Sequence, residues 1–218
     1  MPSVCFYFQV HQPFRLKPYD CFKIGKDGLY EDETKNRDIL ERVAKKCYLP
    51  ANYMMLDLIE KHKGTFRISY SISGTAIEQM EKYQPEVLRS FQMLAETGCV
   101  EFLSETFYHS LSFLYSKREF IRQVDKHRAK IKEHFKQTPQ VFRNTELVYN
   151  NEIANFVPYL GYKAILCEGL DHVLGSRSPN FVYHPPGNNN IKCLLKNYKL
   201  SDDIAFRFSD KGWAEWPL

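Results

Sequence analysis

The sequence predicts an α/β fold in which parallel strands alternate with outer helices, and two observations support this prediction. Short apolar runs rich in β-branched and aromatic residues recur along the chain, and helical segments separate most of them. A strand–helix–strand repeat favours parallel pairing with the helices outside the sheet. In addition, polar residues gather where the predicted strands end, at the edge of such a sheet where working side chains collect.

The first strand is predicted over residues 3–10, because SVCFYFQV has the apolar density of a strand covered on both faces. The connection that follows, residues 11–36, is rich in proline, glycine and charge. At roughly 25 residues it is far longer than the usual loop of about 2 to 6 residues, so we expect it to be functional. A helix near residues 52–62 ends at Gly64, and a second strand covers residues 65–72.

The middle of the chain continues the alternation. A helical region over residues 77–95 is interrupted at Pro85, and Gly98 precedes a third strand at residues 99–104. Residues 118–135 are predicted to form an amphipathic helix, because one stripe of the helix is apolar. The members of this stripe are Phe120, Val124, Ile131 and Phe135.

The last third of the chain contains two more parallel strands. A fourth strand is predicted at residues 140–144, followed by a helix over residues 151–162 that closes at Gly161. A fifth strand follows at residues 163–168. Residues 180–197 are typical of a hairpin, whose second arm is the sixth strand of the alternation.

Composition argues against membrane-spanning, secreted and nucleic-acid-binding proteins. No apolar run approaches the roughly 18 residues that a membrane span needs, and MPSVCFYFQV is not typical of a signal peptide. The net charge of +4 is scattered rather than gathered in a basic block. At 218 residues, 44% of them hydrophobic, the chain can bury a sizeable core in one domain. The 15% aromatic content suits a sugar-binding cleft, although large aromatic cores are the commoner cause.

The six cysteines do not predict a metal site or a disulfide framework. None occurs as C-x-x-C, so the usual zinc spacing is absent. Cys5, Cys167 and Cys193 lie in apolar strand-like runs, where thiols pack as small hydrophobes. Without an export signal we expect reduced thiols in a cytoplasmic protein.

Two groups of polar residues mark the first and third predicted strands. His11 and Gln12 follow the first strand, which Pro13 stops, and they place hydrogen-bonding side chains at the rim. The alternative is that His11 only caps the strand. Glu101 lies inside the third strand, and Glu105 and His109 come just beyond it. A carboxylate within an apolar run should be buried and paired, or have a raised pKa.

FRNTEL, at the end of the fourth strand, is the strongest signal in the sequence. A guanidinium at Arg143 would keep the carboxylate of Glu146 ionised. An ionised carboxylate in a water-poor site is what nucleophilic attack on a sugar carbon requires. The alternative is a buried Arg–Glu pair with a structural role.

Two further features are weaker. LSDDIAFRFSD contains Asp202 and Asp203, which on a strand would point to opposite faces, so that one faces a cleft and the other caps or forms an ion pair. His127 and His134 lie seven residues apart on the amphipathic helix. We expect both to be solvated, because that helix would face outward.

Taken together, these stretches resemble the α-amylase type of glycoside hydrolase family 57. HQPFR is similar to the first family motif, GCVEFL with Glu101 to the second, and FRNTEL with Glu146 to the third. LSDDIAFRFSD and GWAEWPL are similar to stretches that this type carries further along. The motifs occur in order over residues 1–218.

The resemblance implies a (β/α)7 barrel related to the TIM barrel, with six of its seven strands in this chain. It also implies a retaining enzyme that cleaves or transfers α-glucans such as maltooligosaccharides, with Glu146 as the nucleophile. His11 and Glu101 would line the donor sugar site. The further substrate contacts that we expect come from Gln12, His109, Arg143 and Asp203. No metal or organic cofactor is expected.

The sequence departs from the family pattern at its end. The family's general acid/base is an aspartate of a fourth motif on the seventh strand, expected beyond GWAEWPL, and this chain stops at Leu218. We therefore expect residues 1–218 to be the N-terminal part of a longer enzyme, lacking the last strand and a C-terminal helical region. Such a part should be inactive unless Asp203 substitutes for the acid. Its open barrel edge should favour self-association or a covering partner.

Three alternatives remain. A 4-α-glucanotransferase would use the same nucleophile. A non-catalytic glucan-binding or regulatory protein would keep the cleft without the chemistry. A metal-dependent polysaccharide deacetylase has a related barrel, but it needs an aspartate pair near the first strand and two histidines on one helix face. QVHQPF lacks those aspartates, and His127 and His134 lie two helical turns apart.

Overall fold

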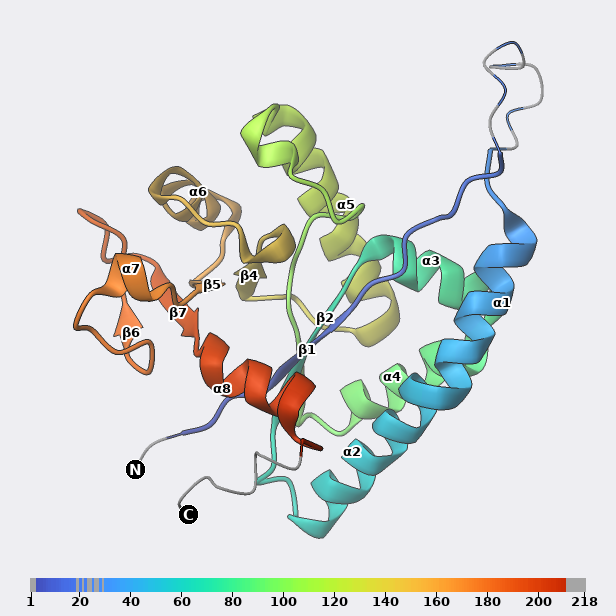
Figure 1. Ribbon diagram of the computed structural model, residues 1–218, viewed down its shortest axis with the longest axis horizontal. Helices are drawn as coiled ribbons and strands as arrows, with labels where there is room; N and C mark the ends of the chain where they lie inside the picture. The colour runs from blue at the N-terminus through green and yellow to red at the C-terminus, as the bar shows by residue number, and fades with distance from the viewer. Residues whose placement is uncertain are drawn as a thin grey trace. The chain divides into compact units, whose positions relative to one another are not determined.

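Two units, each built from parallel strands and helices, make up this computed structural model, which describes residues 3–18, 20, 22, 25, 28 and 30–210. The first unit is Met1–Pro139 and the second is Gln140–Leu218. Figure 1 shows the strands and helices of each unit in chain colours. The predicted α/β class is therefore confirmed.

The sheet of the first unit is parallel throughout, as the sequence predicts. It contains β1 (Tyr7–Val10), β2 (Ile68–Ile72) and β3 (Val100–Phe102) in the order β1-β2-β3. Because parallel strands point the same way, the segments that leave β1, β2 and β3 begin at one edge of the sheet.

Helices cover one face of this sheet, and α1 to α4 lie along the same side of β1 and β2 (Figure 1). The helices of the first unit are α1 (Glu33–Val43), α2 (Leu49–Lys61), α3 (Gly74–Tyr83), α4 (Pro85–Glu96) and α5 (Lys117–Phe135). The break at Pro85 and the long amphipathic helix are confirmed.

The long connection after β1 is shorter than the sequence suggests. Asp32 caps α1 by accepting a hydrogen bond from the backbone N–H of Lys35 at 3.0 Å. From Glu33 the chain is helical through the π-helical turn η2 (Ala44–Tyr48) and on into α2. The prediction of an irregular segment up to residue 36 is wrong at its end, because a charged first turn hid the helical period there.

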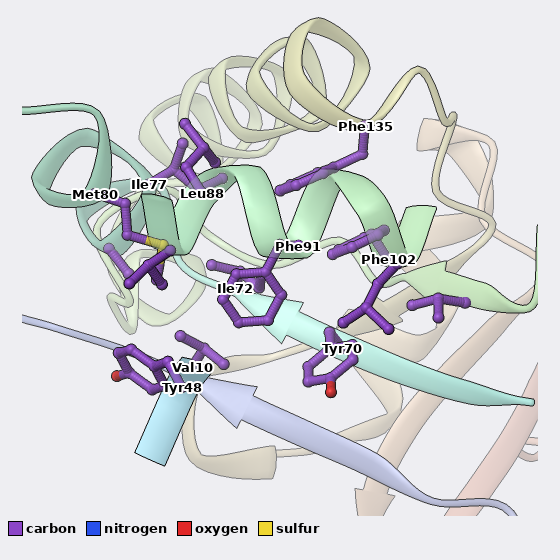
Figure 2. Close-up of a cluster of buried hydrophobic side chains, with 14 of the residues drawn as sticks. Val10, Tyr48, Tyr70, Ile72, Ile77, Met80, Leu88, Phe91, Phe102 and Phe135 are labelled. Atoms are coloured by element: carbon purple, nitrogen blue, oxygen red, sulfur yellow. The ribbon is translucent and has the colours of Figure 1, made fainter. Parts of the chain in front are cut away.

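Apolar side chains from the sheet and these helices form the core of the first unit (Figure 2). Phe102 of β3 stacks on Phe135 of α5 with ring centroids 4.0 Å apart, and Tyr70 of β2 meets Phe91 of α4 edge to face at 5.3 Å. Val10, Tyr70, Ile72 and Phe102 alternate with polar residues along their strands. This alternation leaves one face of the sheet apolar, toward the helices, and the other polar.

The register of the three strands places their polar side chains next to one another on one face of the sheet. Gln9 of β1 pairs with Ser71 of β2, and Ser69 of β2 pairs with Glu101 of β3. Since residues in register on adjacent strands point to the same side, these four side chains share the face opposite the helix core.

The second unit contains a mixed sheet in the order β4-β5-β7-β6. The strands are β4 (Val141–Arg143), β5 (Ala164–Glu168), β6 (Val182–Tyr183) and β7 (Lys192–Lys196). β4, β5 and β7 pair in parallel, whereas β6 pairs antiparallel with β7. The predicted hairpin and the fifth and sixth strands of the alternation are therefore confirmed.

Short helices follow β4, β5 and β7. They are α6 (Asn151–Phe156) with the 3-10 turn η5 (Val157–Leu160), α7 (Asp171–Leu174), and α8 (Tyr198–Asp202) with the π-helical turn η6 (Asp203–Arg207). Gly161 ends the segment after α6 with φ of 90°, as predicted. The strand expected around Asp202 and Asp203 is wrong: Asn197 caps α8 through Leu200 N–H at 3.1 Å, and both aspartates are helical.

Two predictions about composition are tested by the described residues. None of their helices is long and apolar enough to cross a membrane. Cys167 and Cys193 are buried free thiols, as expected, but Cys5 is exposed, because the strand it was assigned to begins only at Tyr7. Cys21 and the stretch GWAEWPL lie outside the described residues.

Candidate active site

The centre of the polar cluster in the first unit is Glu105, which lies just beyond β3. Its side chain is fully buried, with an exposed fraction of 0%. Oε1 of Glu105 accepts a hydrogen bond from Oγ of Ser71 at 2.8 Å, and Oε2 lies 2.9 Å from Nδ1 of His109. A buried carboxyl group is costly unless hydrogen bonds satisfy it, and these two contacts do so.

His109 is held in a single orientation by its two ring nitrogens. The amide Nε2 of Gln9 lies 3.2 Å from Nε2 of His109, and an amide nitrogen can only donate. The ring therefore accepts at Nε2 and carries its proton at Nδ1, from which it donates to Glu105. The backbone of His109 is left-handed, with φ of 53°, a conformation that non-glycine residues adopt at a cost and that clusters at functional sites.

His11 completes this arrangement from the end of β1. Its ring stacks on that of His109 with centroids 4.1 Å apart and an interplanar angle of 25°. Nδ1 of His11 lies 2.8 Å from Oγ of Ser73, the residue that caps α3 by accepting from Ala76 N–H. Two imidazole rings are thus presented together at the edge where β1, β2 and β3 end.

His127 supports the cluster from α5, and the prediction that it is solvated is wrong. Its side chain is fully buried, and burial lowers its pKa. Nε2 of His127 lies 2.7 Å from the carbonyl oxygen of Ile72, and Nδ1 accepts from the backbone N–H of Glu105 at 3.4 Å. The sequence held a signal for this burial, since residue 127 falls between Val124 and Ile131 on the apolar stripe of the helix.

Glu101 and Gln12 occupy different environments from those expected. Glu101 is exposed on the polar face of β3 and so is not buried, but the other expected outcome, a raised pKa, is confirmed, because the surrounding protein desolvates the carboxyl group. Gln12 is buried, with its amide donating to the hydroxyl of Tyr48 at 3.1 Å and accepting from Arg15 at 2.9 Å. Its side chain therefore ties the segment after β1 to η2.

In the second unit, Glu146 lies in the 3-10 turn η4 (Thr145–Leu147), directly after β4. Its side chain is exposed while Thr145 and Leu147 on either side are buried. Glu146 and Leu147 both have left-handed backbones, with φ of 52° and 55°. Two consecutive non-glycine residues in this region store strain. This turn therefore directs the carboxylate of Glu146 outward, directly after β4.

The turn around Glu146 is held by its neighbours. The N–H of Leu147 donates to the carbonyl of Asn144 at 3.0 Å, and the side-chain amide of Asn144 donates to the carbonyl of Val148 at 2.9 Å. Arg143, the last residue of β4, is 2% exposed. A buried strand end and a hydrogen-bonded turn are a rigid base for a reactive side chain.

Asp203 lies at the start of η6 with 6% exposure, and its Oδ1 is 3.4 Å from Nη1 of Arg207. Asp202 is more exposed and lies 4.0 Å from Nζ of Lys196. The ion-pairing role expected for one of the two aspartates is therefore present, on a helix instead of a strand.

The structure brings together part of the predicted set. In the first unit His11 and His109 meet in one network, and in the second unit Arg143 and Glu146 flank the end of β4. The sequence interpretation missed four members of the network as site residues: Gln9, Ser71, Ser73 and His127. The sequence interpretation noted Glu105 but preferred Glu101 as a site residue. The signal that could have identified Glu105 was its spacing of four residues from His109.

A possible metal-ligand group among the described residues consists of Glu81, Glu133 and His134, whose ligand atoms lie within 4.8 Å of one another. The ammonium group of Lys130 lies 2.8 Å from Glu81, which already gives this carboxylate a cationic partner. His127 does not join His134 in a metal site, because backbone groups hold both of its ring nitrogens. This arrangement argues against the deacetylase alternative.

Comparisons with known proteins agree with the motifs. The sequence profile of Glycosyl hydrolase family 57 matches residues 5–218. A Methanocaldococcus jannaschii protein named "Putative alpha-amylase" is 43% identical over 99% of this chain, which covers 46% of that protein. The chain therefore spans about half the length of this relative.

Two solved structures show the same fold at low sequence identity. The 4-alpha-glucanotransferase of Thermococcus litoralis superimposes with a TM-score of 0.68 and 17% identity, over 93% of this chain and 29% of its own. A GH57 branching enzyme of Thermococcus kodakaraensis gives a TM-score of 0.66 and 13% identity, over 92% and 48%.

Proposed function

The chain belongs to glycosyl hydrolase family 57, and from this premise we propose that it is part of a retaining, α-amylase-like enzyme that cleaves α-1,4-glucosidic bonds by double displacement. The observation that carries the proposal is Glu146, an exposed carboxylate on a strained turn at the end of a buried strand. It coincides with the residue to which the family resemblance assigns the nucleophile. The 43% identity to a relative named as an amylase supports an α-glucan substrate.

In the proposed mechanism, a carboxylate oxygen of Glu146 forms a bond to the anomeric carbon while the glycosidic C–O bond breaks. The electron pair leaves with the glycosidic oxygen, which a second carboxylic acid protonates. The same group then takes a proton from water, whose oxygen displaces Glu146 and restores the original configuration. Retention requires the two carboxyl groups to lie about 5–5.5 Å apart. The resemblance assigns the second group to an aspartate of the family's fourth motif.

We assign three of the remaining predicted residues to substrate binding and the other three to support of the site. His11 and His109 contribute their stacked imidazole rings, and Glu101 adds a carboxyl group on the same polar face of the first sheet. Gln12, Arg143 and Asp203 are buried, and they support the segments on which the exposed groups stand. The proposed site needs neither a metal nor an organic cofactor.

We further propose that the six parallel strands, β1 to β5 and β7, are six of the seven in the family's barrel, and that residues 1–218 are its N-terminal part. The parallel pairing within each unit supports this arrangement. β1 has a pairing partner on one side only in the described part of its sheet, so its edge could take up another strand or a second copy. A cytoplasmic location belongs to the same proposal.

The test is to trap the glycosyl-enzyme with an α-glucosyl or α-maltosyl fluoride that carries a second fluorine at ring carbon 5. Fluoride leaves without protonation, so the reaction depends on the nucleophile and not on the general acid. The ring fluorine slows the hydrolysis of the intermediate by destabilising the oxocarbenium-like transition state. We expect one added fluoroglycosyl group, which peptide mass spectrometry locates at Glu146.

Two variants control this experiment. Glu146→Gln should abolish labelling, and Glu152→Gln, which changes an exposed carboxylate on α6, should leave it unchanged. Labelling of another residue, or of Glu146→Gln, would overturn the assignment. Maltooligosaccharide binding in calorimetry without any labelling would favour the non-catalytic glucan-binding alternative. Transfer of glucosyl units to an acceptor sugar in preference to water would favour the glucanotransferase.

A further inference from the structure

His127 lies on α5 in the helical layer, yet its imidazole contacts the backbone at two points of the polar cluster. Ile72 is the last residue of β2, and Glu105 follows β3. Nε2 of the ring lies 2.7 Å from the carbonyl oxygen of Ile72, and Nδ1 lies 3.4 Å from the backbone nitrogen of Glu105. One buried side chain therefore links the ends of two adjacent strands.

These contacts determine the protonation state of the ring. A backbone carbonyl can only accept, so Nε2 of His127 carries the proton and donates to Ile72. A backbone N–H can only donate, so Nδ1 is unprotonated and accepts from Glu105. The neutral Nε2–H tautomer satisfies both contacts, and a charged imidazolium would lose the second. Complete burial lowers the pKa of His127 and so favours the same neutral form.

The position does not require histidine for packing alone. Phe120, Val124 and Ile131 on the same stripe of α5 are all fully buried and apolar. A residue of similar volume without nitrogens would avoid the cost of burying an imidazole. The use of an imidazole is accounted for by its hydrogen bonds to the two backbone groups.

We propose that His127 is a positioning residue that holds the backbone of Glu105, so that the carboxyl group of Glu105 fixes the imidazole ring of His109 in the polar cluster where the glucan is proposed to bind. The identity of the ligand in this inference rests on the proposed function. The chain of hydrogen bonds is independent of that function. Its links are His127 to Glu105 N–H, Glu105 Oε2 to His109 Nδ1, and His109 Nε2 to Gln9. Ser71 holds the other carboxyl oxygen.

Two substitutions separate the two hydrogen bonds of His127. In His127→Asn the amide oxygen replaces Nδ1, so that the acceptor for Glu105 N–H is kept and the donor to Ile72 is lost. In His127→Gln the amide nitrogen replaces Nε2, so that the donor is kept and the acceptor is lost. His134→Gln is the matched control, because His134 lies two turns further on α5 and pairs with Glu81 instead.

The ring nitrogens of His109 report the outcome in 15N-detected NMR of the 218-residue chain, and maltooligosaccharide affinity is measured by calorimetry alongside. We expect His127→Gln to change the His109 tautomer signature and to weaken binding by about 5- to 30-fold, the effect of losing one well-placed hydrogen bond. His127→Asn should keep the signature and an affinity within about twofold of the original. His134→Gln should change neither.

A purely structural role makes a different prediction. If His127→Asn and His127→Gln lower the unfolding temperature and leave the His109 signature unchanged, the positioning role is wrong. The same holds if both variants change the signature equally. If the unsubstituted chain binds no maltooligosaccharide, the proposed function fails, whereas the His109 signature still decides whether His127 positions this residue.

Discussion

Oε2 of Glu105 lies 2.9 Å from Nδ1 of His109, four residues further along the chain and outside any helix. The turn between them is closed by His109 N–H, which donates to the carbonyl of Thr106 at 3.0 Å. The hydroxyl of Thr106 also accepts from Ser110 N–H at 2.8 Å. A carboxyl group and an imidazole are thereby held in a fixed relation at the end of a strand, and this relation underlies the binding role proposed for His109.

Ser73→Ala should lower the stability of the protein and, at the same time, loosen the imidazole ring of His11. The hydroxyl caps α3 and lies 2.8 Å from His11, so its loss should cost about 0.5–2 kcal/mol and release the ring of His11. Chemical denaturation and the His11 resonances measure the two effects. Ser116→Ala removes a similar cap from α5, and it should cost a similar free energy without changing His11. Equal effects of both variants on His11 would contradict the prediction.

Gly74→Ala should destabilise the first unit by about 1–3 kcal/mol or more, because an added Cβ would lie 2.3 Å from a ring carbon of Phe107. Phe107 is fully buried in the segment that joins Glu105 to His109, so the clash should also shift the His109 resonances. Phe107→Leu creates room for the methyl group. The double variant should therefore be more stable than the sum of the two single effects predicts, and strict additivity would show that the clash is absent.

Glu101→Gln should make the protein more stable near neutral pH. Desolvation by the surrounding protein raises the pKa of Glu101 above its ordinary 4.5, so the folded state binds more protons than the unfolded state between the two values. Stability therefore falls as the pH rises through this window, and the substitution removes that loss. Unfolding midpoints of the variant and of the unsubstituted protein, measured from about pH 4 to 7, test this prediction. The same pH dependence in both proteins would contradict it.

Glu119 provides a control of opposite sign on the same unit. Hydrogen bonds from Arg122 and Gln123 lower its pKa to about 2. The unfolded state then binds more protons, so stability is lost as the pH falls from the ordinary carboxyl value toward 2. Glu119→Gln should reduce the loss of stability at acid pH, whereas Glu101→Gln should act at higher pH. The pair separates a specific effect of Glu101 from a general effect of removing negative charge.

Glu146→Gly should stabilise the fold while it removes the proposed nucleophile. A left-handed residue with a Cβ costs about 1–2 kcal/mol, and the entropy that glycine loses on folding offsets part of the gain, which leaves about 0.5–1 kcal/mol. Lys136→Gly is the control, since Lys136 is exposed and ends α5 with φ of 57°. It should give a similar gain in denaturation experiments and leave glycosyl labelling intact. A loss of stability in Glu146→Gly would show that the turn is unstrained.

Local pattern was sufficient for much of the fold. Alternating apolar residues placed β2, Pro85 separated α3 from α4, and an apolar stripe predicted α5, because these features depend on residues within a few positions of one another. α1 and the helical segment around Asp203 were missed, since charged residues hid the period there. Glu146 was located by its motif, but its left-handed backbone could not be read from the residue type.

The sequence by itself determined the α/β class, the family and the carboxylate at position 146. Only the tertiary structure decided which polar side chains meet: Ser71 and Glu105 are 34 residues apart, and His127 reaches Ile72 across 55. Burial depends on what packs against a residue, and an imidazole on an outer helix is solvated or enclosed according to the strand ends beneath it. Packing therefore explains why Glu105 is buried and Glu101 is exposed, although the two residues lie only four positions apart in the sequence.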